Sequence, residues 1–277
     1  MRGFLSALGF LTILPVGSAK RADGRGLSSA RAWFPAVGLL LGTALAAIDL
    51  LLRRLYAVGP SNGADVPVAA PFLTGAVLVV ALVAMTRALH LDGFMDTCDA
   101  LLGGSSPEGR RRILKDPRVG AFAVAGVVCL LLLKLVAVSA VPDQVRPWIL
   151  IVVPCISRGA MLLVMELFPY VGENGLGKAF LERTGRGQLI SGTTLTLLAA
   201  VVLAGPWSLV ILALAGLSAW SIGAIATRLL GGATGDVYGA VNESVEAVAF
   251  LCAALLTLGA PNVSIAPFFM VVGPWHP

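Results

Sequence analysis

The sequence has 277 residues, of which 57% are hydrophobic and only 13% are charged, and its mean hydropathy is +0.90. This composition excludes an ordinary soluble domain and indicates a chain that crosses a membrane several times. The formal net charge is +5. Membrane proteins concentrate Lys and Arg in cytoplasmic loops, so this charge implies no nucleic-acid partner. The four cysteines form no Cys-x-x-Cys pair, so neither a disulfide framework nor a zinc site is predicted.

Apolar stretches alternate with polar ones along the chain. Residues 1–15 are expected to form a short helix on or in the membrane surface. With no internal repeat and no domain boundary, we predict one all-α domain over residues 1–277, a polytopic membrane bundle with roughly six to eight membrane helices. The predicted spans are residues 33–52, 67–85, 121–141, 148–168, 189–203, 207–229 and 247–258, followed by a short apolar run at 263–272.

The polar segments between the spans are predicted to share one side of the membrane. If residues 17–32 are cytoplasmic, alternate crossings place 86–120, 169–188 and 230–246 on that side too. Residues 86–120 include a run of three arginines at 110–112, whereas the opposite loops hold only Arg146. The positive-inside rule therefore predicts a multi-pass protein of the cytoplasmic (inner) membrane, with its catalytic loops facing the cytoplasm. The pair at 53–54 is the exception, and we expect it to reach the far interface.

Three aspartates gather in the first polar segment. In a helix, Asp92, Asp96 and Asp99 lie at i, i+4 and i+7 and share one face. Like charges repel strongly where water is scarce, so a cation should lie against them. A hard divalent cation with oxygen ligands, most simply Mg²⁺, is the expected partner; the alternative is a solvated acidic face. His90 is a candidate for a catalytic or substrate-orienting role, or for a hydrogen-bonded interfacial histidine.

A second acidic stretch has the same design. Asp236 and Glu243 are seven residues apart on one helix face, and Glu246 follows one turn later. Two acidic faces backed by small residues would clamp Mg²⁺ between them. The alternative is that these acids are solvated at a helix start, where they suit the helix dipole.

Cations near both acidic stretches suggest a diphosphate substrate. Bound Mg²⁺ neutralises a leaving phosphate while Arg and Lys hold the remaining oxygens. Arg158 falls inside a span, where an ionisable residue indicates function or a buried ion pair, and Lys134 is expected to pair or to snorkel. A Gly-x-Gly-Lys run is a weak phosphate signal on its own. The candidate substrate-binding residues are Arg87, Lys115, Arg118, Arg158, Gly175 and Gly177.

Several motifs recur in a fixed order over nearly the whole chain. They are His-x-Asp-Gly-x-x-Asp-x-x-Asp at 90–99, Lys-Asp-x-Arg-Val-Gly at 115–120, Gly-Leu-Gly at 175–177 and Gly-Asp with a later Glu at 235–243. On these motifs the chain resembles the cobalamin synthase family, the membrane-bound adenosylcobinamide-GDP ribazoletransferases.

The resemblance implies a reaction of adenosylcobinamide-GDP with α-ribazole, or its 5′-phosphate, that releases GMP and requires Mg²⁺. It also implies a lipid bilayer as the environment, and it is compatible with a homo-oligomer. The proton of the ribazole hydroxyl would pass to His90 or to a carboxylate of Asp92 or Asp96. The metal-binding set implied is Asp92, Asp96, Asp99, Asp236 and Glu243.

Two other functions stay open at this point. A CDP-alcohol phosphatidyltransferase also expels a nucleotide monophosphate with helix-borne aspartates. Its motif, Asp-x-x-Asp-Gly-x-x-Ala-Arg, is incomplete here, because the first Asp and the Ala-Arg pair are missing. An ion-coupled transporter would hold acids near the bilayer midplane, often in repeated halves. Here the acids are predicted at one membrane face, and no repeat is visible.

Overall fold

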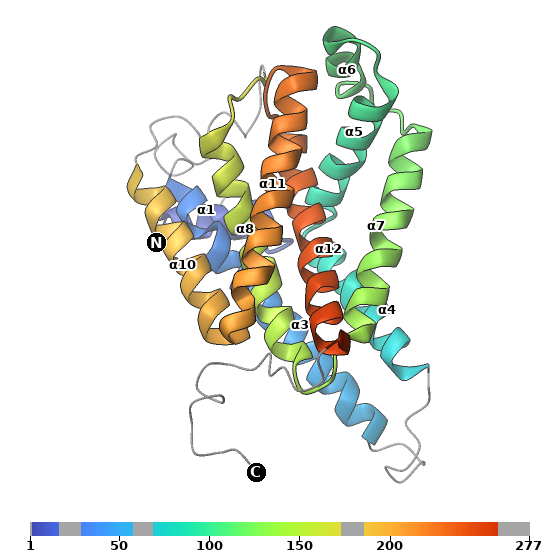
Figure 1. Cartoon of the computed structure of the whole chain (residues 1–277), viewed down its shortest axis with the longest axis vertical. Helices are drawn as coiled ribbons and strands as arrows, with labels where there is room; N and C mark the ends of the chain where they lie inside the picture. The colour runs from blue at the N-terminus through green and yellow to red at the C-terminus, as the bar shows by residue number, and fades with distance from the viewer. Residues whose placement is uncertain (1, 17–28, 58–68, 173–185, 260–277) are drawn as a thin grey trace.

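The computed structural model is an all-helical bundle (Figure 1), and it describes residues 2–16, 29–57, 69–172 and 186–259. Within these ranges there is no β-strand, only an isolated bridge between Tyr170 and Ala233. The predicted all-α fold is confirmed. Its elements are α1 (Arg2–Leu11), η1 (Arg31–Trp33), α3 (Phe34–Ala57), α4 (Ala70–Met85), α5 (Leu89–Gly103), α6 (Pro107–Ile113), α7 (Ala121–Ala140), α8 (Arg146–Leu167), α10 (Arg186–Ala204), η2 (Gly205–Trp207), α11 (Ser208–Leu230) and α12 (Gly235–Gly259).

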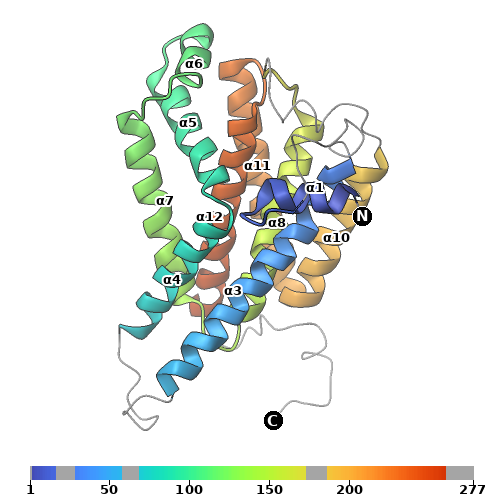
Figure 2. The same ribbon diagram turned by 180° about the vertical axis from the view of Figure 1, so that it is seen from behind.

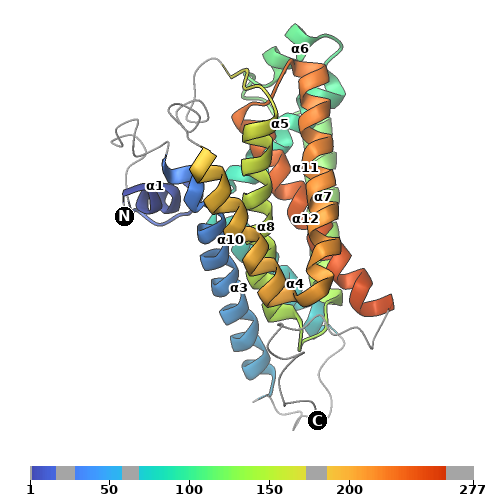
Figure 3. The ribbon, with the colours of Figure 1, turned by 60° about the vertical axis from the view of Figure 1, so that its left-hand side comes forward.

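The number of apolar helices matches a multi-pass membrane protein. Five described helical segments are long and apolar enough to cross a membrane, or six if the bent pair α4–α5 counts as one span. One of the five, Arg186–Leu230, contains both α10 and α11. These two helices are antiparallel and are joined by η2 (Figure 3). The turn falls at Gly205, between the predicted spans 189–203 and 207–229, and its φ of +62° is one that glycine adopts without strain. The predicted run at 263–272 lies outside the described residues.

The polar segment 86–120 begins with a helix, as the spacing of its aspartates predicted, and this helix belongs to the bundle. The axes of α4 and α5 are bent by 91°, and Figure 2 shows α5 rising from this break beside α7. Arg87 and Ala88 form the break with φ values of 54° and 55°, in the left-handed region. The Ala88 amide closes the turn by donating to the Val83 carbonyl oxygen at 2.9 Å. The first acidic motif therefore packs against other helices and does not stand in solvent.

The described parts of three predicted polar segments, 86–120, 169–172 and 230–235, reach one end of the bundle. This end, which we call the α6 end, holds α6, the start of α7 and the ends of α8 and α11 (Figure 1). The far end holds the start of α4, the start of α8 and η2. Charged residues from separate crossings can therefore meet near the α6 end.

An ion-pair cluster at the far end accounts for Arg53, one of the two arginines that are exceptions to the positive-inside rule. Arg146 donates to Asp49 at 2.8 Å, and Arg53 lies 2.8 Å from the same carboxylate. Arg146 also forms a close ion pair with Asp143. The charge of Arg53 is thus balanced inside the protein by Asp49, which is fully buried, and it carries no information on membrane orientation.

Candidate active site

Two glycines set how closely α5 and α12 approach. A β-carbon added to Gly93 would lie 2.9 Å from the Cα of Asp236. A β-carbon added to Gly239 would lie 2.9 Å from the carbonyl oxygen of His90. Both contacts are with backbone, which cannot move aside as a side chain can, so glycine is needed at each position. The close crossing brings Asp236, at the start of α12, next to the aspartates of α5.

The site at this crossing consists of three carboxylates, Asp92, Asp96 and Asp236, which we call the acidic trio. Asp92 is exposed and the other two are half-buried. The negative charges of Asp92 and Asp236 both act on Asp96, and that of Asp92 acts on Asp236. Among the described residues, no Lys or Arg forms an ion pair with any of the three.

The chemistry of the acidic trio fits a hard divalent cation. Three oxygen-donor groups with uncompensated negative charge are what Mg²⁺ prefers in proteins. In the described part of the chain, however, no three His, Cys, Asp or Glu side chains already converge on one point in a way that could hold a metal ion. Binding would therefore require the side chains to rotate toward a shared ion.

Asp99, predicted as a metal ligand, accepts hydrogen bonds from the backbone at the start of α7. Its two carboxylate oxygens accept hydrogen bonds from the backbone N–H groups of Gly120 at 2.6 Å and Ala123 at 2.8 Å. These amides are among the unpaired N–H groups at the start of α7, so Asp99 caps that helix. The two motifs noted in the sequence, at 90–99 and 115–120, are linked by this cap.

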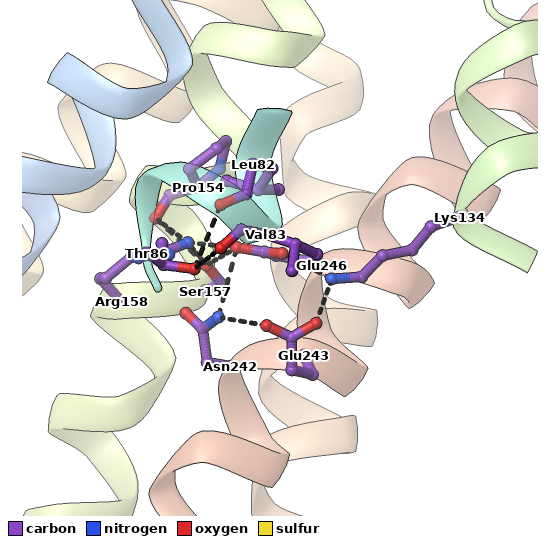
Figure 4. Close-up of polar contacts among 10 residues, drawn as sticks. All are labelled: Leu82, Val83, Thr86, Lys134, Pro154, Ser157, Arg158, Asn242, Glu243 and Glu246. Carbon is purple, nitrogen blue, oxygen red and sulfur yellow. Dashed lines mark hydrogen bonds and ion pairs between the residues drawn. The ribbon is translucent and has the colours of Figure 1, made fainter. Parts of the chain in front are cut away.

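Glu243 of α12, another predicted metal ligand, is buried and faces Lys134 (Figure 4). Its carboxylate accepts a hydrogen bond from Lys134 at 2.5 Å. The metal role of Glu243 stays a prediction from the sequence, and this pairing does not support it. Lys134 forms an ion pair, which was one of its two expected roles.

Arg158, predicted to hold substrate phosphate, is fully buried in α8. It forms a close ion pair with Glu246 of α12 (Figure 4). The sequence had left open whether this arginine contacts substrate or only pairs with an acid, and the geometry favours the second role.

His90 points to the interior of the bundle, whereas Asp92 is exposed. The imidazole is only 2% exposed, and among the described residues neither ring nitrogen has a hydrogen-bond partner. The nearby charges that act on it are those of Arg158, Glu246 and Lys134. His90 therefore lies beneath the acidic trio, on the side of the buried ion pairs.

Three predicted cations, Arg87, Lys115 and Arg118, are exposed. Arg118 forms a bidentate pair with Asp116, with donor–acceptor distances of 2.9 Å and 2.6 Å. The Arg118 guanidinium lowers the pKa of Asp116 to about 2, so this pair stays ionised at neutral pH.

The structure also gives a role to Arg111, one of the three arginines that the sequence analysis used only to predict orientation. Its guanidinium donates to the Leu230 carbonyl oxygen at 3.0 Å and 2.6 Å, at the end of α11. Gly231, with a φ of +88°, follows and leads into the loop before Asp236. A cation beside the last carbonyls of a helix is favourable, but no sequence signal says which helix a given arginine will reach.

The same loop is held on its other side by residues 169–171. The Ala233 amide donates to the Pro169 carbonyl oxygen at 2.8 Å, and the Val171 amide donates to the Ala233 carbonyl oxygen at 2.9 Å. The loop that carries Asp236 is therefore fixed from two directions. The glycine motif that follows this segment, with Gly175 and Gly177, lies outside the described residues.

A family profile described as "Cobalamin-5-phosphate synthase" matches residues 3–255. The chain belongs to the cobalamin-5-phosphate synthase family. The resemblance seen in the motifs is confirmed, and the matched range includes the acidic trio, both helices that carry it and the buried ion pairs.

Relatives in the cobalamin-5-phosphate synthase family match almost end to end. The adenosylcobinamide-GDP ribazoletransferase of Syntrophobacter fumaroxidans is 38% identical over 257 residues, covering 91% of this chain and 98% of the relative. The protein of that name from Stutzerimonas stutzeri is 37% identical over 259 residues, with 93% and 98% covered. The one from Desulforamulus reducens is 32% identical over 240 residues, with 87% and 91% covered. No solved structure matches the chain.

Proposed function

We propose that this chain is an adenosylcobinamide-GDP ribazoletransferase, which joins α-ribazole or its 5′-phosphate to adenosylcobinamide-GDP and releases GMP. The observation that carries the proposal is the nearly full-length match to relatives of that name, at 32% to 38% identity. Membership of this family does not favour a CDP-alcohol phosphatidyltransferase or an ion-coupled transporter.

The reaction breaks a phosphoanhydride bond and forms a phosphate ester bond. A hydroxyl oxygen of the ribazole forms a bond to the phosphorus that is attached to cobinamide, and the bond from this phosphorus to the GMP oxygen breaks. The hydroxyl proton must pass to a base. We assign it to a carboxylate of Asp92 or Asp96 rather than to His90, since these aspartates are accessible and His90 is buried.

We further propose that Asp92, Asp96 and Asp236 hold Mg²⁺, because they are accessible and lack a paired cation among the described residues. Bound Mg²⁺ would neutralise charge on the diphosphate and on the leaving GMP. Asp99 and Glu243 are left out of this set, since Asp99 caps α7 and Glu243 binds Lys134.

The exposed cations Arg87, Lys115 and Arg118 are proposed to hold the phosphate oxygens of the substrate. Arg and Lys form strong charge-assisted hydrogen bonds with phosphate. Arg158 is not included, since it is buried and paired with Glu246. The basic run at 110–112 favours a cytoplasmic position for the α6 end in the inner membrane.

The proposal is tested by measuring GMP release from the purified protein in detergent. The protein is given adenosylcobinamide-GDP and α-ribazole, with Mg²⁺ in one arm and EDTA in the other. Metal-dependent GMP release with an equal amount of cobalamin product is the expected result. No product from folded protein would contradict the activity, whereas equal product in EDTA would contradict only the metal.

A further inference from the structure

Two acidic and two basic side chains are enclosed in the middle of the bundle (Figure 4), and we call them the buried quartet. Lys134 of α7 donates to Glu243 at 2.5 Å and to Glu246 at 2.6 Å, both on α12. Arg158 of α8 forms a close ion pair with Glu246. All four residues are buried. The two positive and two negative charges balance, so the quartet needs no further ion.

The quartet is not a second binding site. The Lys134 ammonium pairs with the carboxylates of Glu243 and Glu246, and the Arg158 guanidinium pairs with Glu246. Each charged group of the quartet therefore already has a partner of opposite charge, and none is unpaired for a ligand to bind. Stability alone is also a weak explanation, because replacing a buried ion pair with apolar residues is often neutral or stabilising. Ionisable residues within a membrane bundle instead indicate a functional constraint.

The quartet fixes the position of α12 along its own axis. Apolar helix faces tolerate small shifts, because neighbouring side chains offer similar packing. Ion pairs between buried groups do not, since a shift leaves a charge unpaired inside the bundle. Moving α12 by one residue would displace its side chains by about 1.5 Å and rotate them by about 100°. Such a shift would break the contacts of Lys134 and of Arg158 together.

The helix held in this way also carries Asp236 of the acidic trio. Asp236 precedes Glu243 by seven residues, which is about 10 Å along a helix. Between them, Gly239 packs on the backbone of His90 in α5. A rotation or slide of α12 would therefore turn Asp236 away from Asp92 and Asp96. Neither Lys134 nor Arg158 need touch substrate to affect the acidic trio.

We infer that Lys134 and Glu246 are positioning residues, which fix the register of α12 so that Asp236 faces Asp92 and Asp96. The inference rests on the proposed function for the metal-binding role of the acidic trio. Its prediction is that loss of the quartet weakens divalent-cation binding at a site that none of its members contacts.

The test uses the purified full chain with Lys134→Met, which removes the ammonium and keeps the length of the side chain. Binding of Mn²⁺ is followed by electron paramagnetic resonance, and the Mg²⁺ concentration for half-maximal GMP release is measured separately. We expect Mn²⁺ affinity to fall and the Mg²⁺ requirement to rise by about tenfold or more, as when other indirect supports of a metal site are removed. Lys134→Arg keeps a cation for both carboxylates, so its values should stay near those of the wild type.

A matched control breaks a similar buried pair at the far end of the bundle. Arg146→Met removes the 2.8 Å contact with Asp49 and should lower thermal stability without changing Mn²⁺ affinity. If Lys134→Met does not fold, the double variant Lys134→Met, Glu243→Gln is used, since it leaves only the balanced pair of Glu246 and Arg158. A smaller loss of Mn²⁺ affinity is expected from it, because the link from α12 to α7 is lost while the pair of Glu246 and Arg158 still links α12 to α8.

Two outcomes would overturn the inference, and a third would support it while contradicting the proposed reaction. A folded Lys134→Met protein, or the folded double variant, with wild-type Mn²⁺ affinity would overturn the inference. Absence of Mn²⁺ binding by the wild type would overturn it too. Wild-type protein that binds Mn²⁺ through the quartet-dependent site but releases no GMP would support the inference while contradicting the proposed reaction.

Discussion

Gly93 of α5 and Gly239 of α12 face each other where the two helices cross: a β-carbon added to Gly239 would lie 3.2 Å from the Cα of Gly93. Neither helix can carry a side chain at this point without moving its partner. The same crossing brings Asp236 beside Asp92 and Asp96. The geometry of the candidate metal site therefore depends on two residues that have no functional group of their own.

We expect Gly93→Ala to reduce activity strongly and to destabilise the fold by about 1 to 3 kcal/mol, as overpacking does in a close-packed interior. The added methyl group would meet the Asp236 backbone at 2.8 Å to 2.9 Å. GMP release and the thermal midpoint measure the two effects. Gly216→Ala is the control, because its β-carbon meets nothing within 4 Å. A Gly93→Ala protein with wild-type turnover would show that the close crossing is not required.

Asp96→Asn and Asp236→Asn should each lower turnover by about 100-fold or more, if both carboxylates bind the ion that stabilises the transition state. Folding should be retained, because removing one of several like charges relieves repulsion. Turnover is measured across a range of Mg²⁺ concentrations. Glu108→Gln, an exposed acid on α6, is the matched control and should leave turnover unchanged. Near-normal turnover of a correctly folded Asp96→Asn protein would remove this residue from the site.

Asp99 offers a way to separate a helix cap from a metal ligand. Asp99→Ala should destabilise the protein by about 1 to 2 kcal/mol, because the amides of Gly120 and Ala123 lose their acceptor. Asp99→Asn keeps one of the two acceptor oxygens and should recover about half of this loss. The thermal midpoint reports the stability lost with the helix cap. The Mg²⁺ concentration needed for half-maximal turnover reports whether Asp99 binds the metal. If Asp99→Asn were stable but needed far more Mg²⁺, the ligand role implied by the motif would be correct after all.

Arg111→Ala should weaken the connection between α6 and the loop that carries Asp236. The lost hydrogen bonds to the Leu230 carbonyl oxygen are expected to cost about 1 kcal/mol of stability and to reduce turnover. Arg112→Ala removes the same charge from the next residue and is the control for a general effect on anionic lipid or substrate. Equal effects of the two substitutions on turnover and thermal midpoint would indicate that charge, and not the contact with α11, is what matters.

The sequence was sufficient for the fold class, the approximate spans and the family. Apolar runs of spanning length are a local property, and the structure confirms the all-helical bundle and the turn at Gly205. The spacing of Asp92 and Asp96 likewise predicted that they share a helix face. The break at Arg87 and Ala88 had no such signal, because these residue types do not favour the left-handed backbone found there.

What the sequence could not decide was which acid meets which partner. Asp236, Glu243 and Glu246 look equivalent in the sequence, since helical periodicity places all three near one face of the same helix. Only the packing of α12 against α5, α7 and α8 separates them, leaving Asp236 accessible beside the aspartates and burying the other two against Lys134 and Arg158. Periodicity fixes the direction of a side chain around its own helix, but its charge partner depends on which neighbouring helix lies at that depth, and that is a property of the assembled bundle.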